Sequence, residues 1–322
     1  MANLQMKNKK ELFKLCTENI QITPTEKRTC LNDKATKLLF NITAETYSKI
    51  TQGKLMGIVE KKNHKKKGKV KSGFTLQNEN GYTYIAPLDE YDRAVFDVFI
   101  SEYEEGNRVI SVNMIYRALT GKIGEGSIPA VPEKQQIIDI RQAADKLMCT
   151  VFDPDILKAF EELKYDGAEQ VVKSTVQPQK RTKNVTINGK QADEELIHFL
   201  DESPLYKIAK IKGQILTYDA RLLDVPNQHN SRLTIMLKNY TLRRVVECMQ
   251  HSKTFKPILT LDDIFEKCRI KDASKRIKQA ARETLDKFFA HLLTQKIDGK
   301  SFIKSYKWNK KGNKFYSIEF TY

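Results

Sequence analysis

Two aspartates are the clearest candidates for catalysis in this chain of 322 residues. Asp153 and Asp155 stand two residues apart in the stretch VFDPDI, a spacing that enzymes use to hold two metal ions for nucleotidyl transfer. Pro154 lies between them, and because proline is unusual in the middle of a strand, the stretch favours a turn or the start of a helix. A metal-dependent nucleotidyl transferase or primase is therefore the less favoured alternative for this protein.

Other catalytic motifs are missing from the sequence. There is no phosphate-binding G-x-x-x-x-G-K-[ST] loop, and the stretch GKIGEG lacks its spacing. The five histidines form no His-x-His pair and the five cysteines form no C-x-x-C pair, which argues against a metal site of either kind. We therefore expect a protein that is not an enzyme and that uses neither a metal nor another cofactor. Dispersed cysteines, and the lack of an apolar run of about 18 residues, predict a cytoplasmic protein without a membrane partner.

The net charge of +16 is distributed unevenly along the chain. Residues 1–88 carry 17 Lys and Arg against 7 Asp and Glu, and residues 253–322 carry 17 against 8. The middle of the chain, residues 89–252, carries 22 against 25. Two basic ends around a near-neutral middle indicate surfaces for a polyanion such as nucleic acid. High lysine usage in an AT-rich genome is the alternative explanation.

The basic residues after Ile270 have the spacing of one helix face. Asp272 or Ser274 is expected to cap this helix, and its predicted buried face consists of Ile277, Ala280, Ala281, Leu285, Phe288 and Leu292. Lys271, Lys275, Lys278 and Arg282 follow at i, i+4, i+7 and i+11, which predicts one basic stripe directed away from the core. Ser274 and Gln279 flank the stripe. Gln can bond adenine, and Lys or Arg can bond guanine or phosphate, so the stripe predicts DNA contact, with a solvated lysine face as the alternative.

Further basic residues lie in predicted hairpins. The C-terminal stretch FIKSYKWNKKGNKFYSIEF predicts a hairpin that turns at Lys311-Gly312, and its lysines are suited to a phosphate backbone or a minor groove. These lysines are Lys304, Lys307, Lys310, Lys311 and Lys314. Their alternative role is to discourage aggregation at a strand edge. A second predicted hairpin has its tip at 61–71, with Lys65, Lys66 and Lys67 as candidate contacts, whereas Arg243 and Arg244 are weaker candidates because either can simply face solvent.

Two stretches 137 residues apart are nearly alike: IRQAADKL at 140–147 and IKQAARETL at 277–285. Each follows a helix, a short strand and a second helix, predicted within 89–121 and within 229–270. These blocks predict one structural unit built twice, with its length difference in the loop 121–132. In the first copy Arg141 and Gln142 are candidate DNA contacts, but Asp145 stands where Arg282 aligns, which predicts weaker DNA contact or packing against another subunit.

Helix, short strand, helix, longer helix and hairpin is the element order of a winged helix-turn-helix. The sequence therefore predicts an α+β fold with two tandem winged helix-turn-helix domains, mostly helical with short β-hairpin wings, plus a basic N-terminal extension. The predicted parts are the extension 1–88, a first domain 89–225 with an enlarged β wing or insertion, and a DNA-reading second domain 226–322. Between the copies we expect a helix in DPDILKAFEELKYDG, an exposed linker or hairpin in KSTVQPQKRTKNVTINGK, and strands in PLYKIAKIKGQILTYDARLLDV.

Over residues 89–322 the chain resembles the double winged-helix plasmid replication initiators, which bind repeated origin sequences called iterons. The stretches that carry the resemblance are VISVNMIYRALTG, NSRLTIMLKNYTLRRVVECM, LDDIFEKCRI and KRIKQAARETLDKFF. The resemblance implies that the C-terminal unit reads the major groove with Lys275, Lys278, Gln279 and Arg282, while the N-terminal unit forms a homodimer and contacts flanking backbone. It implies a protein that binds double-stranded origin repeats and recruits host replication proteins. The alternative within the same class is a winged-helix transcriptional or partition regulator.

Overall fold

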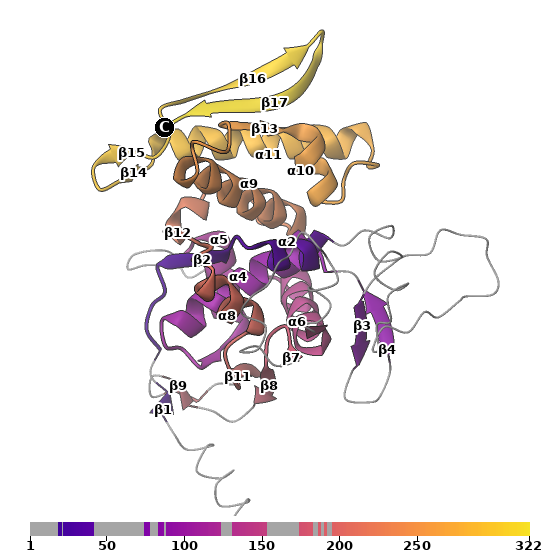
Figure 1. The fold of residues 1–322 in the computed structure, drawn as a ribbon, viewed down its shortest axis with the longest axis vertical. Coiled ribbons are helices and arrows are strands. Elements are labelled where there is room, and N and C mark those ends of the chain that lie inside the picture. The colour runs from indigo at the N-terminus through magenta and orange to yellow at the C-terminus, as the bar shows by residue number, and fades with distance from the viewer. Residues whose placement is uncertain are drawn as a thin grey trace, which may run out of the picture.

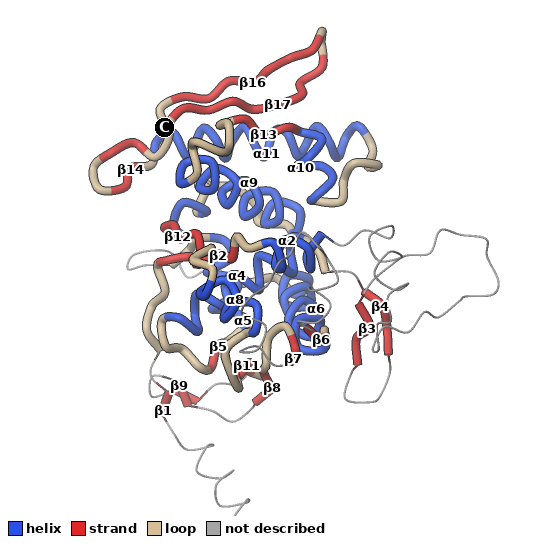
Figure 2. Tube along the Cα trace, viewed as in Figure 1, coloured by secondary structure: helices blue, strands red, loops and turns tan. Residues whose placement is uncertain are grey.

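The computed structural model describes residues 19–20, 22–41, 74–77, 83–86, 88–123, 131–152, 174–182, 186–187, 190–191 and 195–322. These residues form a mixed α+β structure in which helices occupy the middle of the body and short, mostly antiparallel strands lie around them (Figure 2). The predicted α+β class is thus confirmed. The predicted helix from Asp153 onward and the predicted hairpin tip at 61–71 lie outside the described residues.

The first unit begins with helix α4, whose first turn is closed by a capping box between Asp89 and Asp92. Its elements are α4 (Glu90–Glu104), β5 (Val109–Ile110), α5 (Val112–Thr120), α6 (Lys134–Cys149), β8 (Gln179–Thr182) and β11 (Leu196–Phe199). The three strands form one antiparallel sheet in the order β5-β11-β8. The first strand of the unit therefore pairs with the last one.

The second unit has the same order of elements and the same order of strands. It consists of α9 (Arg232–Gln250), β13 (Ile258–Thr260), α10 (Leu261–Lys267), α11 (Lys275–Thr294), β16 (Ser305–Lys311) and β17 (Lys314–Thr321). Its sheet has the order β13-β17-β16 and is antiparallel throughout. The predicted C-terminal hairpin is confirmed, and Gly312 in its turn has a φ of 61°, which favours glycine.

The segment between the two units differs from its prediction. PLYKIAKI forms helix α8 (Pro204–Ile211) rather than a strand, because Pro204 occupies its first turn and Leu205, Ile208 and Ala209 are buried at helical spacing. It is followed by β12 (Ile215–Asp219) and a short 3-10 helix η2 (Ala220–Leu223). The hairpin of the first unit is instead formed by β8 and β11, with β9 (Thr186–Ile187) and β10 (Lys190–Gln191) between them.

Part of the predicted N-terminal extension belongs to the core. Strand β2 (Lys27–Leu31) pairs antiparallel with β12 and lies against α4, and helix α2 (Lys34–Asn41) follows it (Figure 1). Cys30 and Leu31 are fully buried, and the guanidinium of Arg93 donates to the carbonyl of Leu31 at 2.7 Å. Residues 27–41 are therefore built into the body rather than attached to it.

Several short strands complete the described structure. β3 (Phe74–Gln77) pairs with β4 (Thr83–Ala86), β6 (Val151–Phe152) pairs with β7 (Ser174–Thr175), and β1 (Asn19–Ile20) pairs parallel with β9. In the second unit β14 (Lys296–Ile297) and β15 (Lys300–Ser301) form a small hairpin after α11. Strands are thus present in the stretch KSTVQPQKRTKNVTINGK. Of its two predicted alternatives, an exposed linker and a hairpin, the hairpin is the one that requires strands.

Helix α9 joins the two units through a buried ionic contact. In Figure 1 it lies between α11 and the first unit, and its arginine Arg243 reaches α4. The Arg243 guanidinium donates to the carboxylate of Glu90 and, at 3.3 Å, to that of Asp97, and all three side chains are at least 95% buried. Buried apolar residues of both units belong to one continuous core. The two units are therefore packed together rather than joined by a free linker.

Gly121 allows the end of α5 to pack closely against η2. It ends α5 in a left-handed conformation with a φ of 78°, and a Cβ atom there would lie 2.5 Å from the amide nitrogen of Asp224. Gly106 also has a positive φ, 94°, but a Cβ there would meet nothing within 4 Å. Gly106 is therefore a matched control for the effect of backbone conformation alone.

We expect Gly121→Ala to lower the free energy of unfolding more than Gly106→Ala does. Both variants place alanine in a left-handed conformation, at about 1–2 kcal/mol each, and the clash at Gly121 adds about 1–3 kcal/mol because backbone must move. Urea denaturation of both variants measures the difference. Equal losses would show that η2 yields easily to a side chain at this position.

Candidate nucleic-acid interface

The turn between α10 and α11 is fixed by caps on both helices. Thr260 caps α10 by accepting from the amide of Asp263, and Ser274 caps α11 by accepting from the amide of Ile277. The cap at Ser274 is one of the two that were predicted for this helix, Asp272 being the other candidate. Between the helices Arg269 has a φ of 56°, and its guanidinium donates to the carbonyl of Leu88 at 2.8 Å. The turn is thus held against the residue that precedes Asp89, the N-cap of α4.

The predicted buried face of α11 is buried only from Ala281 onward. The buried face consists of Ala281, Leu285, Phe288, Phe289 and Leu292. Ile277 and Ala280, both predicted to be buried, are exposed. In Figure 1 the N-terminal end of α11 extends beyond α9, which packs against the helix further along. The outward face at this end therefore includes Ile277 and Ala280.

Not all residues of the predicted basic stripe lie on the same element. Lys271 precedes the helix, lies in the turn and pairs with Glu266 at 3.1 Å. Lys275 is exposed, Lys278 is half-buried, and Gln279 is exposed and donates to Glu283 at 3.0 Å. The helix thus brings together Lys275, Lys278 and Gln279, but Lys271 is not on its face.

Arg282 lies against the C-terminal hairpin, which we define as β16–β17. Its guanidinium stands 4.4 Å from the ring centre of Phe315, and the ammonium of Lys310 stands 4.6 Å from the same ring. Contacts of this kind hold a cation in place without neutralising its charge. A hollow of about 420 Å³ lies between helix and hairpin, and it is lined by Arg282, Glu283, Asp286, Lys287, Trp308 and Phe315.

Asp286 fastens the hairpin to α11. Its carboxylate accepts from the indole Nε1 of Trp308 at 2.8 Å and from the hydroxyl of Tyr306 at 3.0 Å. Burial and this hydrogen bond raise the pKa of Tyr306 to about 12, so the phenol stays protonated and remains a donor at neutral pH. Asp286 therefore joins the helix to the hairpin.

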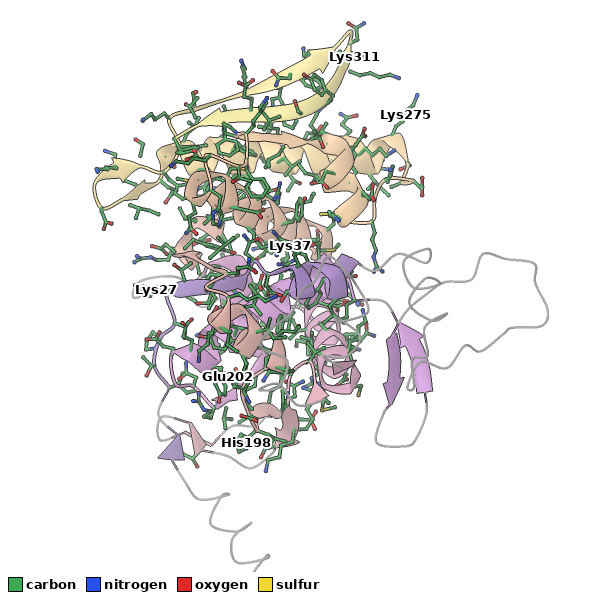
Figure 3. All side chains as sticks on the ribbon, in the orientation of Figure 1. Lys27, Lys37, His198, Glu202, Lys275 and Lys311 are labelled. Atoms are coloured by element: carbon green, nitrogen blue, oxygen red, sulfur yellow. The ribbon has the colours of Figure 1, made fainter. Side chains whose placement is uncertain are left out.

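The five predicted hairpin lysines have different surroundings. Lys307 pairs with Glu319 across the strands at 3.1 Å, which lowers the pKa of that carboxyl, and Lys304 donates to the carbonyl of Tyr322. Lys310, Lys311 and Lys314 are exposed beside the turn, where Lys311 stands opposite Lys314. Lys311 and Lys275 are labelled at the same end of the second unit in Figure 3. The hairpin tip thus extends the basic surface that begins on α11.

The first unit is less basic at the aligned positions. Gln142 is exposed and Arg141 is half-buried, as the α6 equivalents of Gln279 and Lys278. Asp145, the equivalent of Arg282, forms an ion pair with Arg181 on β8. Hairpin and third helix are thus joined by an ion pair in the first unit, whereas the second unit keeps a cation at this position.

Five of the predicted residues lie outside the described residues: Lys65, Lys66, Lys67, Asp153 and Asp155. Within the part of the chain that is described, no three His, Cys, Asp or Glu side chains group closely enough to hold a metal ion. None of the described helices combines the length and the apolar character needed to cross a bilayer.

Arg276 and Lys287 were missed by the sequence reasoning. Both are exposed, and they lie on the face of α11 opposite Ala281 and Leu285. The helical spacing of Ala281, Leu285, Phe288 and Leu292 defines the buried face of the helix. Arg276 and Lys287 lie on the opposite face, so this spacing could have predicted that both are exposed. The outward surface therefore has more cations than the predicted stripe.

Comparison of the chain with protein-family models, with curated proteins and with solved structures found no match.

Proposed function

We propose that this protein binds double-stranded DNA in a sequence-specific manner, without covalent chemistry, through two tandem winged helix-turn-helix domains. In this proposal α11 enters the major groove and the C-terminal hairpin is the wing that follows the phosphate backbone. The first unit contacts DNA more weakly, through Gln142 and Arg141.

The observation that carries the proposal is the basic surface of the second unit on this arrangement of elements. Residues 275–287 hold five cations, Lys275, Arg276, Lys278, Arg282 and Lys287, against the acids Glu283 and Asp286. Residues 304–314 hold five lysines and no acid. A helix that follows another helix after a short connection and precedes a basic hairpin suits a groove and its adjoining phosphates.

We further propose that the DNA consists of origin repeats and that the protein starts replication of a plasmid or another mobile element, with host replication proteins as partners. The doubled unit and the resemblance to iteron-binding initiators support this role. A homodimer through the first domain belongs to the same proposal. A plasmid that depends on the chain and on adjacent direct repeats for its maintenance would test initiation separately from DNA binding.

The expected result in a binding assay with duplex DNA is an affinity that falls steeply with salt. Each phosphate neutralised by a Lys or Arg contributes a slope of about 0.9 in log affinity against log salt. Fluorescence anisotropy between 50 and 300 mM salt measures this slope for random and selected duplexes. Binding that ignores salt, or no binding at all, would refute the proposed function.

A further inference from the structure

Two apolar side chains stand uncovered among the cations of α11. Ile277 is 42% exposed and Ala280 is exposed, yet their counterparts in α6, Ile140 and Ala143, are completely buried. The same sequence pattern thus builds core in the first unit and surface in the second. Contacts with the described residues do not bury the apolar side chains at these two positions of α11.

The surroundings of this pair indicate which surface would cover it. Lys275 and Arg276 precede it on exposed positions, and Gln279, which can both donate and accept, lies beside it. A complementary surface must be anionic at its rim, must offer hydrogen-bonding groups, and must be apolar where Ile277 and Ala280 meet it. The major groove of DNA has these properties, since phosphates flank it and the C5-methyl group of thymine projects into it.

We propose that Ile277 and Ala280 contact thymine methyl groups and thereby select A·T pairs at defined positions of the DNA site. This inference rests on the proposed function and deepens it. The apolar pair would supply discrimination that the cations cannot, because contacts to phosphate are the same for every sequence.

The test begins with selection of preferred duplexes from a random pool by the full chain. Each thymine of the selected site is then replaced by uracil, which differs only in lacking the C5-methyl group. We expect at least one such replacement to weaken binding about fourfold, the factor that burial of one methyl-sized group supplies. At the thymine that Ile277 contacts, Ile277→Ala should remove the effect of this replacement, because the partner of the methyl group is already gone.

Ile211→Ala is the matched control, since Ile211 is 52% exposed on α8, in the segment between the two units. This variant should keep the fourfold preference for thymine. The inference would be overturned if no uracil replacement in the selected site weakened binding, or if Ile277→Ala retained the full preference for thymine over uracil. Either result would leave DNA binding intact. A pool that yields no preferred sequence would instead refute sequence reading, and this inference with it.

Discussion

Replacing Arg243 by alanine is expected to lower the free energy of unfolding by about 3–5 kcal/mol, the range found when one partner of a buried ion pair is removed. The guanidinium of Arg243 forms ion pairs with Glu90 and Asp97 in the core between α9 and α4, and the charge of Arg93 also acts on both carboxylates. Without Arg243 both carboxylates remain buried and lose the compensation that it supplies. Because this contact joins the two units, we expect a single unfolding transition at a lower urea concentration.

The pH dependence of this loss has a defined sign. Burial raises the pKa of Asp97, and the charge of Arg243 opposes that rise. In the variant the folded state binds protons more readily than the unfolded state does, so its stability falls as pH rises above about 4, where unfolded carboxyl groups lose their protons. The difference from the unaltered protein should therefore be larger at pH 7 than at pH 4.

Arg221→Ala is the control for Arg243→Ala. Arg221 also pairs with two carboxylates, those of Asp219 and Glu26, but its side chain is 54% exposed. Exposed pairs contribute about 0–1 kcal/mol, so this variant should unfold almost as the original does. Similar losses in the two variants would show that the buried contact contributes no more than a surface pair.

Replacing Lys310, Lys311 and Lys314 together by alanine is expected to weaken duplex binding about equally for every sequence. These lysines surround the turn of the C-terminal hairpin, where contact with phosphate carries no sequence information. If each neutralises one phosphate, the slope of log affinity against log salt falls by about 2.7. By contrast, replacing Lys278 and Gln279 should relax the preference for the selected sequence by about 1–3 kcal/mol per lost base contact.

The hairpin β14–β15 provides a control of the same chemistry. Lys296 and Lys300 are exposed on it, and in Figure 1 it lies at the other end of α11 from the turn of the C-terminal hairpin. Replacing both lysines should leave the salt slope nearly unchanged. If the tip variant and the α11 variant behave alike, the assignment of sequence reading to α11 and of phosphate contact to the hairpin is wrong.

Local patterns in the sequence were sufficient for much of the second unit. The apolar spacing of Leu285, Phe288 and Leu292, the caps at Thr260 and Ser274, and the turn at Gly312 are all set by neighbours in the chain. The near-repeat of IRQAADKL and IKQAARETL likewise marked two third helices in equivalent places. DNA contact by any of the candidate residues remains a prediction.

Long-range pairing was beyond such patterns. Cys30 meets Tyr218 across 188 residues, and nothing near either residue indicates that β2 pairs with β12. The sequence also left open whether Arg243 faces solvent, because its burial depends on two carboxylates in α4. The exposure of Ile277 had a similar cause: helical spacing shows which residues share a face, but not where the covering helix ends.

The buried contact between α9 and α4 has a consequence for the length of DNA that the chain would span. A flexible tether would let α6 and α11 adjust their separation to any arrangement of bases. Here packed side chains set the separation between α6 and α11. The two helices would therefore fit only one spacing between their contact sites on the DNA. One added base pair between the two contact sites rotates one site relative to the other by about a tenth of a helical turn. With a fixed separation of α6 and α11, one of the two helices would then be misaligned with its site.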